Sequence, residues 1–529
     1  MNSILPLLRG ASLRTSLRTP PRISLRAPLK FSSRTVPRAF ISTAPTTIAG
    51  FLNFKPQEPV SDVNINGFVR SVRAQKRYHF VSLGDGSSLE SLQAVVPADQ
   101  AEGLNTGAAV RLHGSWVPSK GRGQSHELQV ERAVVLGPSD AKTFPLQKKY
   151  QTPEYLRTLP HLRPRIPFNS AVLRLRSEII ASLIRFFSGR DFVQTHTPIL
   201  TSSDCEGAGE VFRVSAGDPV QSSTESETQK SFFRRPVYTT VSAQLHLEAL
   251  AQALGNVWTL SPTFRAEQSD TPRHLSEFYM LEAEMSFADK LDSVMDLVED
   301  MLRHIGTDLA GSRVKDELLT RVGESSSDLA TAEQVSQRWD GLIREAWPRI
   351  TYTEAIELLK QSETPFIHSP TWGKDLATEH EKYIAMKVGK GNSPVFVTHY
   401  PRDIKAFYMK ADEEVSHTAA SSTTVECFDL LVPDFCEIAG GSMREHRLEN
   451  LLESMRNHGI APRQSSDDST ESPQTAENNL NWYVDLRRWG CPPHGGFGLG
   501  FDRLICYLSG VQTIHDTSAF PRWYGRCDC

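Results

Sequence analysis

The chain has 529 residues, of which 39% are hydrophobic and 23% are charged, and its formal net charge is −4. This length allows two or three domains, and the composition is ordinary for a globular protein. No run of about 18 uninterrupted apolar residues occurs, so we expect no membrane-spanning segment. The slight acidity excludes recognition of nucleic acid by overall charge, and any such contact needs a local basic surface.

Residues 1–50 differ in composition from the rest of the chain. They hold eight of the 58 basic residues, many serines and threonines, and no acidic residue, since the first is Glu58. This composition is typical of a mitochondrial transit peptide and predicts a location in the mitochondrial matrix. A basic arm that contacts RNA is the alternative. Seven scattered cysteines without a CxxC pair argue against a disulfide framework and against a structural zinc site.

Residues 58–140 contain five short runs of alternating apolar and polar residues, separated by turn signals. The pattern predicts about five strands in a small barrel, for which an OB-fold is the expected form. Such barrels bind single-stranded nucleic acid by stacking bases on aromatic side chains in a basic groove. Phe80 follows several basic residues and could serve this purpose, or it could belong to the barrel core.

Residues 141–168 are rich in proline and basic residues and are predicted to form an interdomain hinge. A helix is predicted over 169–190, because apolar residues recur there at helical spacing. That apolar stripe could pack within one chain or between two. Further on, Glu206 stands beside two glycines in a predicted loop, where a carboxylate suits an ammonium group. Residues 215–236 are polar and are predicted to be an insertion.

Residues 237–250 are predicted to be extended, with Ser242, Gln244 and His246 on one side. The next stretch, 257–287, runs from apolar through polar to apolar, which predicts two antiparallel strands joined by a loop. Alternation then places two sets of side chains on facing sides, namely Thr263, Arg265 and Glu267, and Phe278, Met280, Glu282 and Glu284. These sets could hold a phosphate-bearing, base-bearing ligand. A solvated hairpin with incidental ion pairs is the alternative.

The last third of the chain adds further candidates. Asp429 and Glu437 would favour Mg²⁺ if they lay beside a triphosphate, although as residues alone they could be surface charges. Residues 459–480 are predicted to be a disordered insertion, because they are polar and lack an apolar period. Residues 495–500 hold four glycines that could let the backbone approach a nucleotide. A helix beginning near Asp502 would put Arg503 in its first turn, where phosphate is favoured.

Three of these stretches resemble class II aminoacyl-tRNA synthetases of the aspartyl, asparaginyl and lysyl subgroup. FRAEQSDTPRHLSEF followed by YMLEAEMSF resembles motif 2, GFGLGFDRL resembles motif 3, and the helix, short strand and Pro198 resemble motif 1. The resemblance implies an α+β chain, in which an N-terminal OB-fold β-barrel precedes a class II antiparallel-sheet catalytic domain flanked by helices, over 169–529. Motif 1 implies a homodimer.

The resemblance also implies roles for individual residues. Arg265 would bind the α-phosphate of ATP, Phe278 would stack on adenine, and the outer phosphates and the rest of the nucleotide site would involve Arg503, Arg273, His274, Glu267 and Glu437. Arg265 and Arg503 would be the catalytic residues, and Asp429 and Glu437 would hold Mg²⁺. The amino acid would be bound by Glu206, Ser242, Gln244, Glu282 and Arg444. In the barrel, Phe80 would stack on the central anticodon base and Gln93 would hydrogen-bond its edge.

Residue 247 carries the prediction of the substrate. Aspartyl enzymes have a lysine at this position of SxQxxK, where its charge meets the substrate carboxylate, but this chain has Leu247. A leucine cannot neutralise an anion, which favours a neutral amide. The resemblance is greatest to the asparaginyl members. It implies ATP-dependent ligation of L-asparagine to tRNA(Asn) through an asparaginyl adenylate, for mitochondrial translation.

Three alternatives are an aspartyl-tRNA synthetase, including one that charges both tRNAs, an asparagine synthetase on the same catalytic fold, and an RNA-binding protein with an inactive site. The barrel argues against the second, because a small-molecule ligase needs no anticodon reader. Retention of Arg265 and Arg503 argues against the third. Asp502 stands where the family usually has glutamate, and we expect this shortening to be tolerated.

Overall fold

The computed structural model describes residues 44–121, 123–202, 210–215, 232–233, 235–322, 329–344, 346–412, 423–460 and 480–529. Glu206 lies outside these residues, as do positions 1–43 of the predicted leader and most of the two predicted insertions, 215–236 and 459–480. Within the described part of the chain, no helix has the length and apolar character needed to cross a bilayer.

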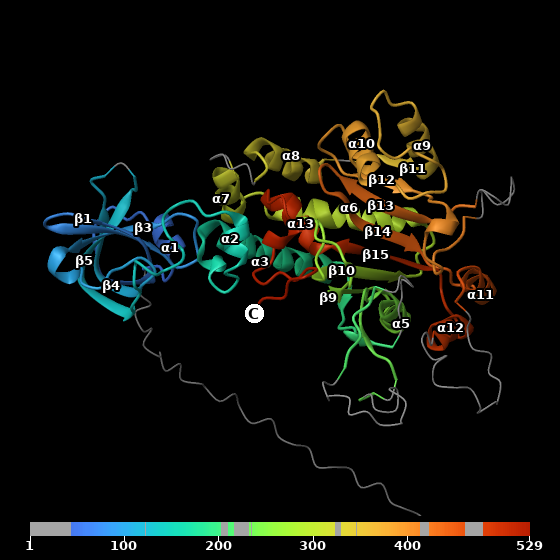
Figure 1. Cartoon of the computed structure of the whole chain (residues 1–529), viewed down its shortest axis with the longest axis horizontal. Helices are drawn as coiled ribbons and strands as arrows, with labels where there is room; N and C mark the ends of the chain where they lie inside the picture. The colour runs from blue at the N-terminus through green and yellow to red at the C-terminus, as the bar shows by residue number, and fades with distance from the viewer. Residues whose placement is uncertain are drawn as a thin grey trace, which may run out of the picture. The chain divides into compact units, whose positions relative to one another are not determined.

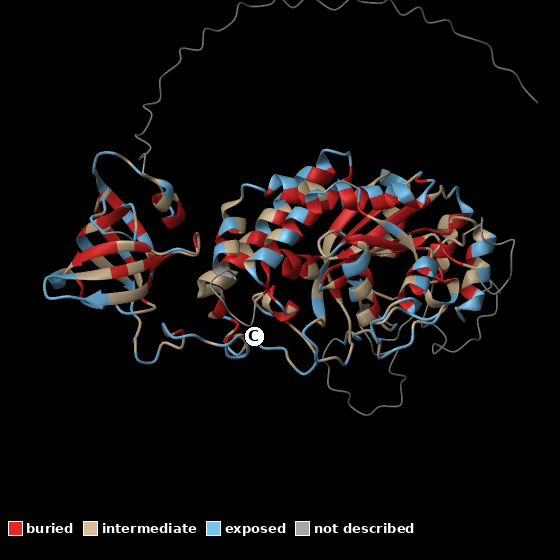
Figure 2. Ribbon diagram, turned by 90° about the horizontal axis from the view of Figure 1, so that it is seen from above, coloured by how far each residue is buried: buried red, intermediate tan, exposed pale blue. Residues whose placement is uncertain are grey.

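The first folded unit is a closed barrel with the strand order β1-β2-β3-β5-β4. This confirms the five strands predicted from alternation. Buried valine, leucine and isoleucine side chains fill the interior. Figure 2 shows the buried residues as red stretches along the barrel strands. The strands are β1 (Val60–Ala74), β2 (Tyr78–Gly84), β3 (Leu92–Pro97), β4 (Ala109–Pro118) and β5 (His126–Gly137).

A short helix, α1 (Ile48–Asn53), belongs to the barrel. Its Ile48 and Phe51 are almost fully buried in the barrel core. The backbone N–H of Ile48 donates to Asp85 Oδ2 over 2.9 Å, which fixes the start of the helix. The leader predicted over residues 1–50 overlaps the first three residues of this packed helix.

The segment 141–168, predicted to be a hinge, contains α2 (Pro153–Arg157) and a short turn of 3₁₀-helix at Arg163–Arg165. Arg163 is buried, with an Nη1 to Asp516 Oδ1 distance of 3.1 Å, and its Nη2 also donates to the carbonyl of His515. The hinge is thus tied to a segment near the end of the chain.

The second folded unit is built on an eight-stranded sheet in the order β11-β12-β13-β14-β15-β10-β9-β6 (Figure 1). The six central strands are antiparallel, and the two edge pairs, β11 with β12 and β6 with β9, are parallel. The sheet is therefore antiparallel in its centre, as the family resemblance implied, and parallel at its two edges. Its strands are β6 (Val193–Gln194), β9 (Val257–Phe264), β10 (Glu277–Ser286), β11 (Arg349–Thr351), β12 (Val395–Thr398), β13 (Cys427–Val432), β14 (Cys436–Met443) and β15 (His494–Gly500). A separate pair comprises β7 (Leu200–Thr201) and β8 (Tyr238–Thr239).

Helices pack against this sheet and bury its apolar face. The predicted helix over 169–190 is confirmed as α3, and its apolar stripe packs on α6, α7 and α13 of the same chain. The stripe is thus intramolecular core. The helices are α3 (Pro167–Ser188), α5 (Gln244–Leu254), α6 (Leu291–Asp308), α7 (Arg313–Val322), α8 (Ala332–Ile343), α9 (Tyr352–Lys360), α10 (Thr378–Val388), α11 (Leu448–Asn457), α12 (Asn481–Arg488) and α13 (Phe501–Ser509).

One prediction from alternation was wrong. The run that begins at Gln244 is helical as α5, so Ser242, Gln244 and His246 do not share one side of an extended strand. Leu245, Leu247 and Ala251 are buried at helical spacing, and helix-favouring leucine and alanine dominate the run.

Candidate active site

Two adjoining cavities lie on the sheet face that carries the polar residues of β10. The first, of about 190 Å³, is called here the Gln244 chamber, and the second, of about 210 Å³, the Phe278 chamber. They share Arg265, Met280, Glu437 and Gly498 in their linings. The predicted alternation along β10 explains why its polar residues reach the cavities. Leu281 packs into the core beneath the sheet, while Met280 and Glu282 face the cavities.

The Phe278 chamber brings together the residues predicted for a nucleotide. Its lining includes Arg265, Glu267, Arg273, His274, Phe278, Glu437 and Arg503. The guanidinium carbon of Arg265 lies 5.7 Å from the centre of the Phe278 ring. Glu267 lies between Arg265, whose Nη1 is 3.8 Å away, and His274, whose Nε2 is 3.3 Å away. A flat ring beside convergent guanidinium groups suits a base that carries phosphates.

The other two arginines of this chamber are fixed by backbone oxygens. Arg503, in the first turn of α13, donates from Nη1 to the carbonyl of Glu437 over 2.8 Å. Arg273 donates from Nη2 to the carbonyl of Phe435 over 3.0 Å. Because neutral carbonyls and not carboxylates fix these two groups, their charge stays available to an anion.

The Gln244 chamber holds the residues predicted for an amino acid, apart from Glu206. It is lined by Ser242, Gln244, Leu247, Glu282 and Arg444, together with Asp429. Glu282 is buried and accepts hydrogen bonds from Ser242 Oγ at 2.5 Å and from the Ala243 N–H at 2.9 Å. This carboxylate therefore sits at the N-terminus of α5, where the helix dipole favours negative charge.

Arg444 and Glu284 form a buried pair in the wall of the same chamber. Arg444 Nη2 lies 3.1 Å from Glu284 Oε2, and its Nη1 donates to Ser442 Oγ over 2.7 Å. Burial favours the neutral form of Arg444, but the carboxylates of Glu284 and Glu248 outweigh burial and raise its pKa. The chamber thus presents a guanidinium and carboxylates beside apolar Leu247, which is a donor and acceptor set for a polar, uncharged group.

Asp429 and Glu437 both face this cavity. A Cβ atom at Gly440 would lie 3.1 Å from Glu437 Oε1 and 3.4 Å from Asp429 Oδ1, so the two oxygens converge over the glycine. Burial and the nearby charge of Asp429 raise the pKa of Glu437. Within the described residues no three metal-ligating side chains cluster. Two hard oxygen donors are nevertheless enough for Mg²⁺, which takes its remaining ligands from phosphates and water.

Sequence reasoning missed two charged residues at this end of the site. Lys405 lines the Gln244 chamber, and its Nζ lies 2.8 Å from Asp429 Oδ2. Glu381, on α10, feels the negative charges of Glu437 and Asp429; burial and that repulsion raise its pKa to about 7. Neither residue stands in a recognisable motif, and only the fold brings them here.

The glycines of β15 differ in what they allow: some permit close packing of strands, and others line the cavities. A Cβ atom at Gly496 would lie 2.0 Å from Glu284 Oε2 and 2.3 Å from the Ala283 carbonyl, so this glycine permits close packing of β15 on β10. Gly498, in contrast, lines both chambers. The prediction of close approach to a nucleotide therefore fits Gly498 and not Gly496.

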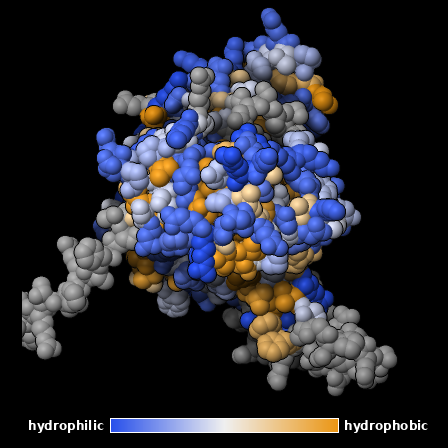
Figure 3. All heavy atoms as spheres, turned by 90° about the vertical axis from the view of Figure 1, so that its left-hand side faces the viewer, coloured by the Kyte–Doolittle hydropathy of each residue, from blue (hydrophilic) through white to orange (hydrophobic). Residues whose placement is uncertain are grey.

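The two barrel residues predicted to read an anticodon lie on one face of the barrel. Phe80 pairs with Val95 and Gln93 with Ser82 across β2 and β3, so both side chains point the same way. Phe80 is partly exposed and lies outside the barrel core, with the Arg73 guanidinium 4.8 Å from its ring centre. Figure 3, turned so that the barrel faces the viewer, shows a mainly hydrophilic surface with small hydrophobic patches.

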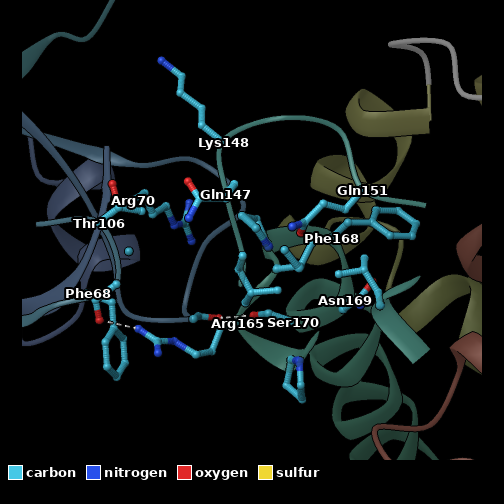
Figure 4. A pocket seen from close by; sticks show the side chains of 18 of the residues that line it. Phe68, Arg70, Thr106, Gln147, Lys148, Gln151, Arg165, Phe168, Asn169 and Ser170 are labelled. Atoms are coloured by element: carbon cyan, nitrogen blue, oxygen red, sulfur yellow. Dashed lines mark hydrogen bonds between the residues drawn. The ribbon is translucent and has the colours of Figure 1, made fainter. Parts of the chain in front are cut away.

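A larger cavity, of about 660 Å³, lies along the hinge (Figure 4). Arg165 lies over the ring of Phe68, 4.2 Å from its centre, and donates to the Gly107 carbonyl, while Lys148 points away from the other side chains. Arg165 is thus engaged by neighbouring groups, and Lys148 is turned outward. We assign the chemistry to the two smaller chambers, because convergent charged groups lie there.

The comparisons with known proteins agree with this geometry. A family described as tRNA synthetases class II (D, K and N) matches residues 153–524, and one described as OB-fold nucleic acid binding domain matches residues 63–136. The fold and the two-chambered cleft are thus those of a class II aminoacyl-tRNA synthetase of the D, K and N group.

Relatives narrow the assignment within that group. The mitochondrial asparagine–tRNA ligase of Saccharomyces cerevisiae is 42% identical and covers 87% of this chain and 92% of its own. The asparaginyl-tRNA synthetase of Mus musculus is 41% identical, with 88% and 91% covered. Asparaginyl-tRNA synthetase from Pyrococcus horikoshii, solved in complex with asparaginyl-adenylate, has a TM-score of 0.72 at 27% identity and covers 89% of this chain and 99% of that one. The chain belongs to the asparaginyl-tRNA synthetase family.

Proposed function

We propose that the protein ligates L-asparagine to tRNA(Asn), using ATP and passing through an asparaginyl adenylate. The observation that carries the proposal is the convergence of Arg265, Phe278 and Arg503 on one chamber, beside a second chamber that contains Leu247 where a lysine would serve an acidic substrate. The family membership and the asparaginyl-adenylate complex of the Pyrococcus horikoshii relative support the choice of reaction.

In the first step, an oxygen of the asparagine carboxylate attacks the α-phosphorus of ATP. A carboxylate–phosphorus bond forms, the bond from the α-phosphorus to the oxygen that bridges to the β-phosphorus breaks, and diphosphate leaves. We assign Arg265 to the α-phosphate, Phe278 to adenine, and Arg273, Arg503 and His274 to the outer phosphates. Their fixed guanidinium groups would stabilise charge without reorganising during the reaction.

In the second step, a terminal ribose hydroxyl of the tRNA attacks the adenylate carbonyl and AMP leaves. Neither step needs a nucleophile from the protein, so correct placement of the reactants is the main contribution. Glu282, held by Ser242 and by the start of α5, would bind the substrate ammonium together with Gln244. Arg444 would donate to the oxygen of the side-chain amide. We also assign Glu206 to the ammonium.

Asp429 and Glu437 would hold Mg²⁺, since their oxygens converge over Gly440. When bound, the ion would neutralise charge on the ATP phosphates. Lys405 contacts the other carboxylate oxygen of Asp429 and so would fix the orientation of that ligand.

The barrel would bind the anticodon, with Phe80 stacked on the central base and Gln93 at its edge. Gln93 is oriented for this by a hydrogen bond from its Nε2 to Glu127 Oε2 over 3.2 Å. The hinge and catalytic domain would extend from about residue 141 to the end of the chain.

We further propose that the enzyme acts in the mitochondrial matrix as a homodimer. The acid-free, arginine-rich composition of residues 1–43 supports a cleaved leader, and we place its cleavage before Thr47, the N-cap of the packed helix α1. The mitochondrial relative in yeast supports the same location. Exposed Val193, Ile199 and Leu200, which follow α3, are apolar surface that a second copy could cover.

The test is ATP–pyrophosphate exchange by the purified full chain, with asparagine and aspartate measured side by side. We expect exchange with asparagine and little with aspartate. Exchange with aspartate alone would replace the proposal by an aspartyl enzyme. Synthesis of free asparagine from aspartate, without tRNA charging, would replace it by an asparagine synthetase. Cross-linking and light scattering would report the dimer.

A further inference from the structure

A group of six buried charged residues lies around and behind the Gln244 chamber. This buried charge cluster consists of Glu248, Glu282, Glu284, Arg444, Arg487 and His494, and each is less than 9% exposed. Three of them, Glu282, Glu284 and Arg444, line the chamber itself. The other three lie behind it, on α5, α12 and β15, and have no role in the mechanism given above.

Glu248 is the centre of this second layer. It follows Gln244 by one turn of α5, and its Oε1 accepts a hydrogen bond from Gln244 Nε2 over 3.1 Å. Its Oε2 accepts from Arg487 Nη2 and from the Tyr483 hydroxyl, both over 2.7 Å. The Gln244 amide nitrogen is thus held from behind, which leaves its oxygen as the acceptor that can meet a substrate.

His494 completes the layer as a cation. Its Nε2 lies 3.1 Å from Glu248 Oε2 and its Nδ1 lies 2.8 Å from the Pro492 carbonyl oxygen. Both neighbours can only accept hydrogen bonds, so both ring nitrogens must carry protons. Burial disfavours this charge, but hydrogen bonds with Cys491 and Glu248 outweigh burial and raise the pKa of His494 to about 10.

Burial raises the pKa of Glu284 and its ion pair with Arg444 opposes that rise. With Glu284 ionised in this pair, three carboxylates face two guanidinium groups and one imidazolium, so the charges of the cluster cancel. Unbalanced charge is felt strongly in a buried, weakly polarisable site. If the substrate side chain were a carboxylate, the cluster and the ligand together would carry one uncompensated negative charge. A carboxamide brings no charge and keeps the balance.

Given the proposed specificity for asparagine, we propose that Glu248 is a positioning residue that selects carboxamide over carboxylate. It does so by balancing the charges of Arg487 and His494 behind the amino-acid chamber, while its hydrogen bond to Gln244 holds a side chain that meets the ammonium group common to both amino acids. Leu247 stands in the chamber lining where an acidic substrate would need a cation. Glu248 neutralises Arg487 and His494 behind the chamber. The two adjacent residues of α5 thus act on the same choice from opposite sides.

The test is the ratio of kcat/KM for asparagine to kcat/KM for aspartate in pyrophosphate exchange by the full chain. Glu248→Gln removes one negative charge while keeping the size of the side chain. We expect the ratio to fall by about tenfold or more, because the excess positive charge now suits a carboxylate. Both amino acids carry the same ammonium group, so a disturbed Gln244 would weaken both alike and leave the ratio unchanged.

A double variant separates charge balance from general damage. Glu248→Gln with Arg487→Met removes one charge of each sign, and replacement of a buried pair by neutral groups is often tolerated by the fold. We expect its ratio to return toward that of the wild type even if its rates are lower. Tyr483→Phe, which removes a hydrogen bond to Glu248 without changing charge, is the matched control and should keep the wild-type ratio.

Each outcome has one meaning. A wild-type ratio in Glu248→Gln, or a ratio in the double variant as low as in the single one, would overturn the inference. If Glu248→Gln does not fold, the double variant decides alone. A low ratio in the double variant then overturns the inference, and a wild-type ratio supports it. Absence of asparagine-dependent exchange in the wild-type protein would instead overturn the proposed function.

Discussion

The barrel and the eight-stranded sheet both bury one face of their strands, but they place charged side chains differently. The barrel core is apolar, and Phe80 and the basic residues around it lie at the surface. The sheet buries ionised groups such as Glu248, Glu284 and Arg444 beside its cavities. A buried charge costs free energy unless it is paired. The difference indicates that the barrel is built for stability with a surface site, and the sheet for an enclosed site that depends on complete pairing.

The largest effect is expected where a buried pair of the sheet is broken. Arg487→Met leaves Glu248, which is fully buried, without the guanidinium 2.7 Å away. We expect a loss of about 3–5 kcal/mol of stability, measured as a lower midpoint of thermal unfolding. Arg111→Met is the control, because Arg111 is exposed on β4 and its side chain hydrogen-bonds to the exposed side chain of Asn66; its effect should stay within about 0.5 kcal/mol. Equal effects in both variants would remove the contrast between the two regions.

The second prediction concerns catalysis in the sheet. Arg265→Ala removes the guanidinium shared by the two chambers. If one such contact contributes about 3 kcal/mol in the transition state, asparagine-dependent pyrophosphate exchange should fall about a hundredfold. Arg111→Ala on the barrel should leave the exchange rate unchanged. A near wild-type rate in Arg265→Ala would refute the role given to Arg265.

The third prediction concerns pH and the acidic end of the site. The pKa of Glu381 is raised to about 7, by burial and by Glu437 and Asp429, from about 4.5 in the unfolded chain. As the pH rises, the folded protein keeps the Glu381 proton to a higher pH than the unfolded chain does. The stability that protonated Glu381 contributes is therefore fully present below about pH 4.5 and is lost as the pH rises through 7.

Glu381→Gln cannot ionise and should be free of that loss. Relative to the wild type, we expect it to be more stable by about 2 kcal/mol at pH 8 and equally stable near pH 4.5. Unfolding midpoints at the two pH values provide the measurement, with Glu131→Gln on the exposed side of the barrel as the control. A constant difference between wild type and Glu381→Gln across this range would contradict the assignment.

The smallest expected effect belongs to the barrel surface. Phe80→Ala removes a partly exposed ring that would stack on one base. Stacking of this kind contributes about 1–3 kcal/mol, so KM for tRNA should rise about tenfold. Pyrophosphate exchange, which needs no tRNA, should not change. Leu136→Ala, at another exposed apolar position of the barrel, should alter neither quantity. A loss of exchange in Phe80→Ala would mean that the ring supports the fold.

The sequence predicted what depends on neighbouring residues. Alternation along β10 correctly separated Leu281, which is buried beneath the sheet, from Met280 and Glu282, which face the cavities. Helical spacing located α3. Alternation misled at Gln244, where a short polar and apolar mixture continues as a helix.

Side-chain partners far along the chain could not be predicted. Lys405 meets Asp429 across 24 residues, and Arg487 meets Glu248 across 239. No periodicity or composition encodes these pairs, because they exist only once strands and helices from different parts of the chain pack together. The same holds for Glu381, which carries no motif and reaches the site through the packing of α10 on β13 and β14.

Asp502 makes contacts with residues that lie much earlier in the chain. Its Oδ1 lies 2.5 Å from Arg176 on α3, 326 residues earlier, and its Oδ2 accepts from the backbone N–H of Tyr279 on β10. Asp516 reaches back in the same way to Arg163 in the hinge. Such distant contacts slow folding, because long loops must close before they form. During synthesis, the first half of the catalytic domain therefore leaves the ribosome before Asp502 and Asp516 have been made. Its final packing must wait for these two residues.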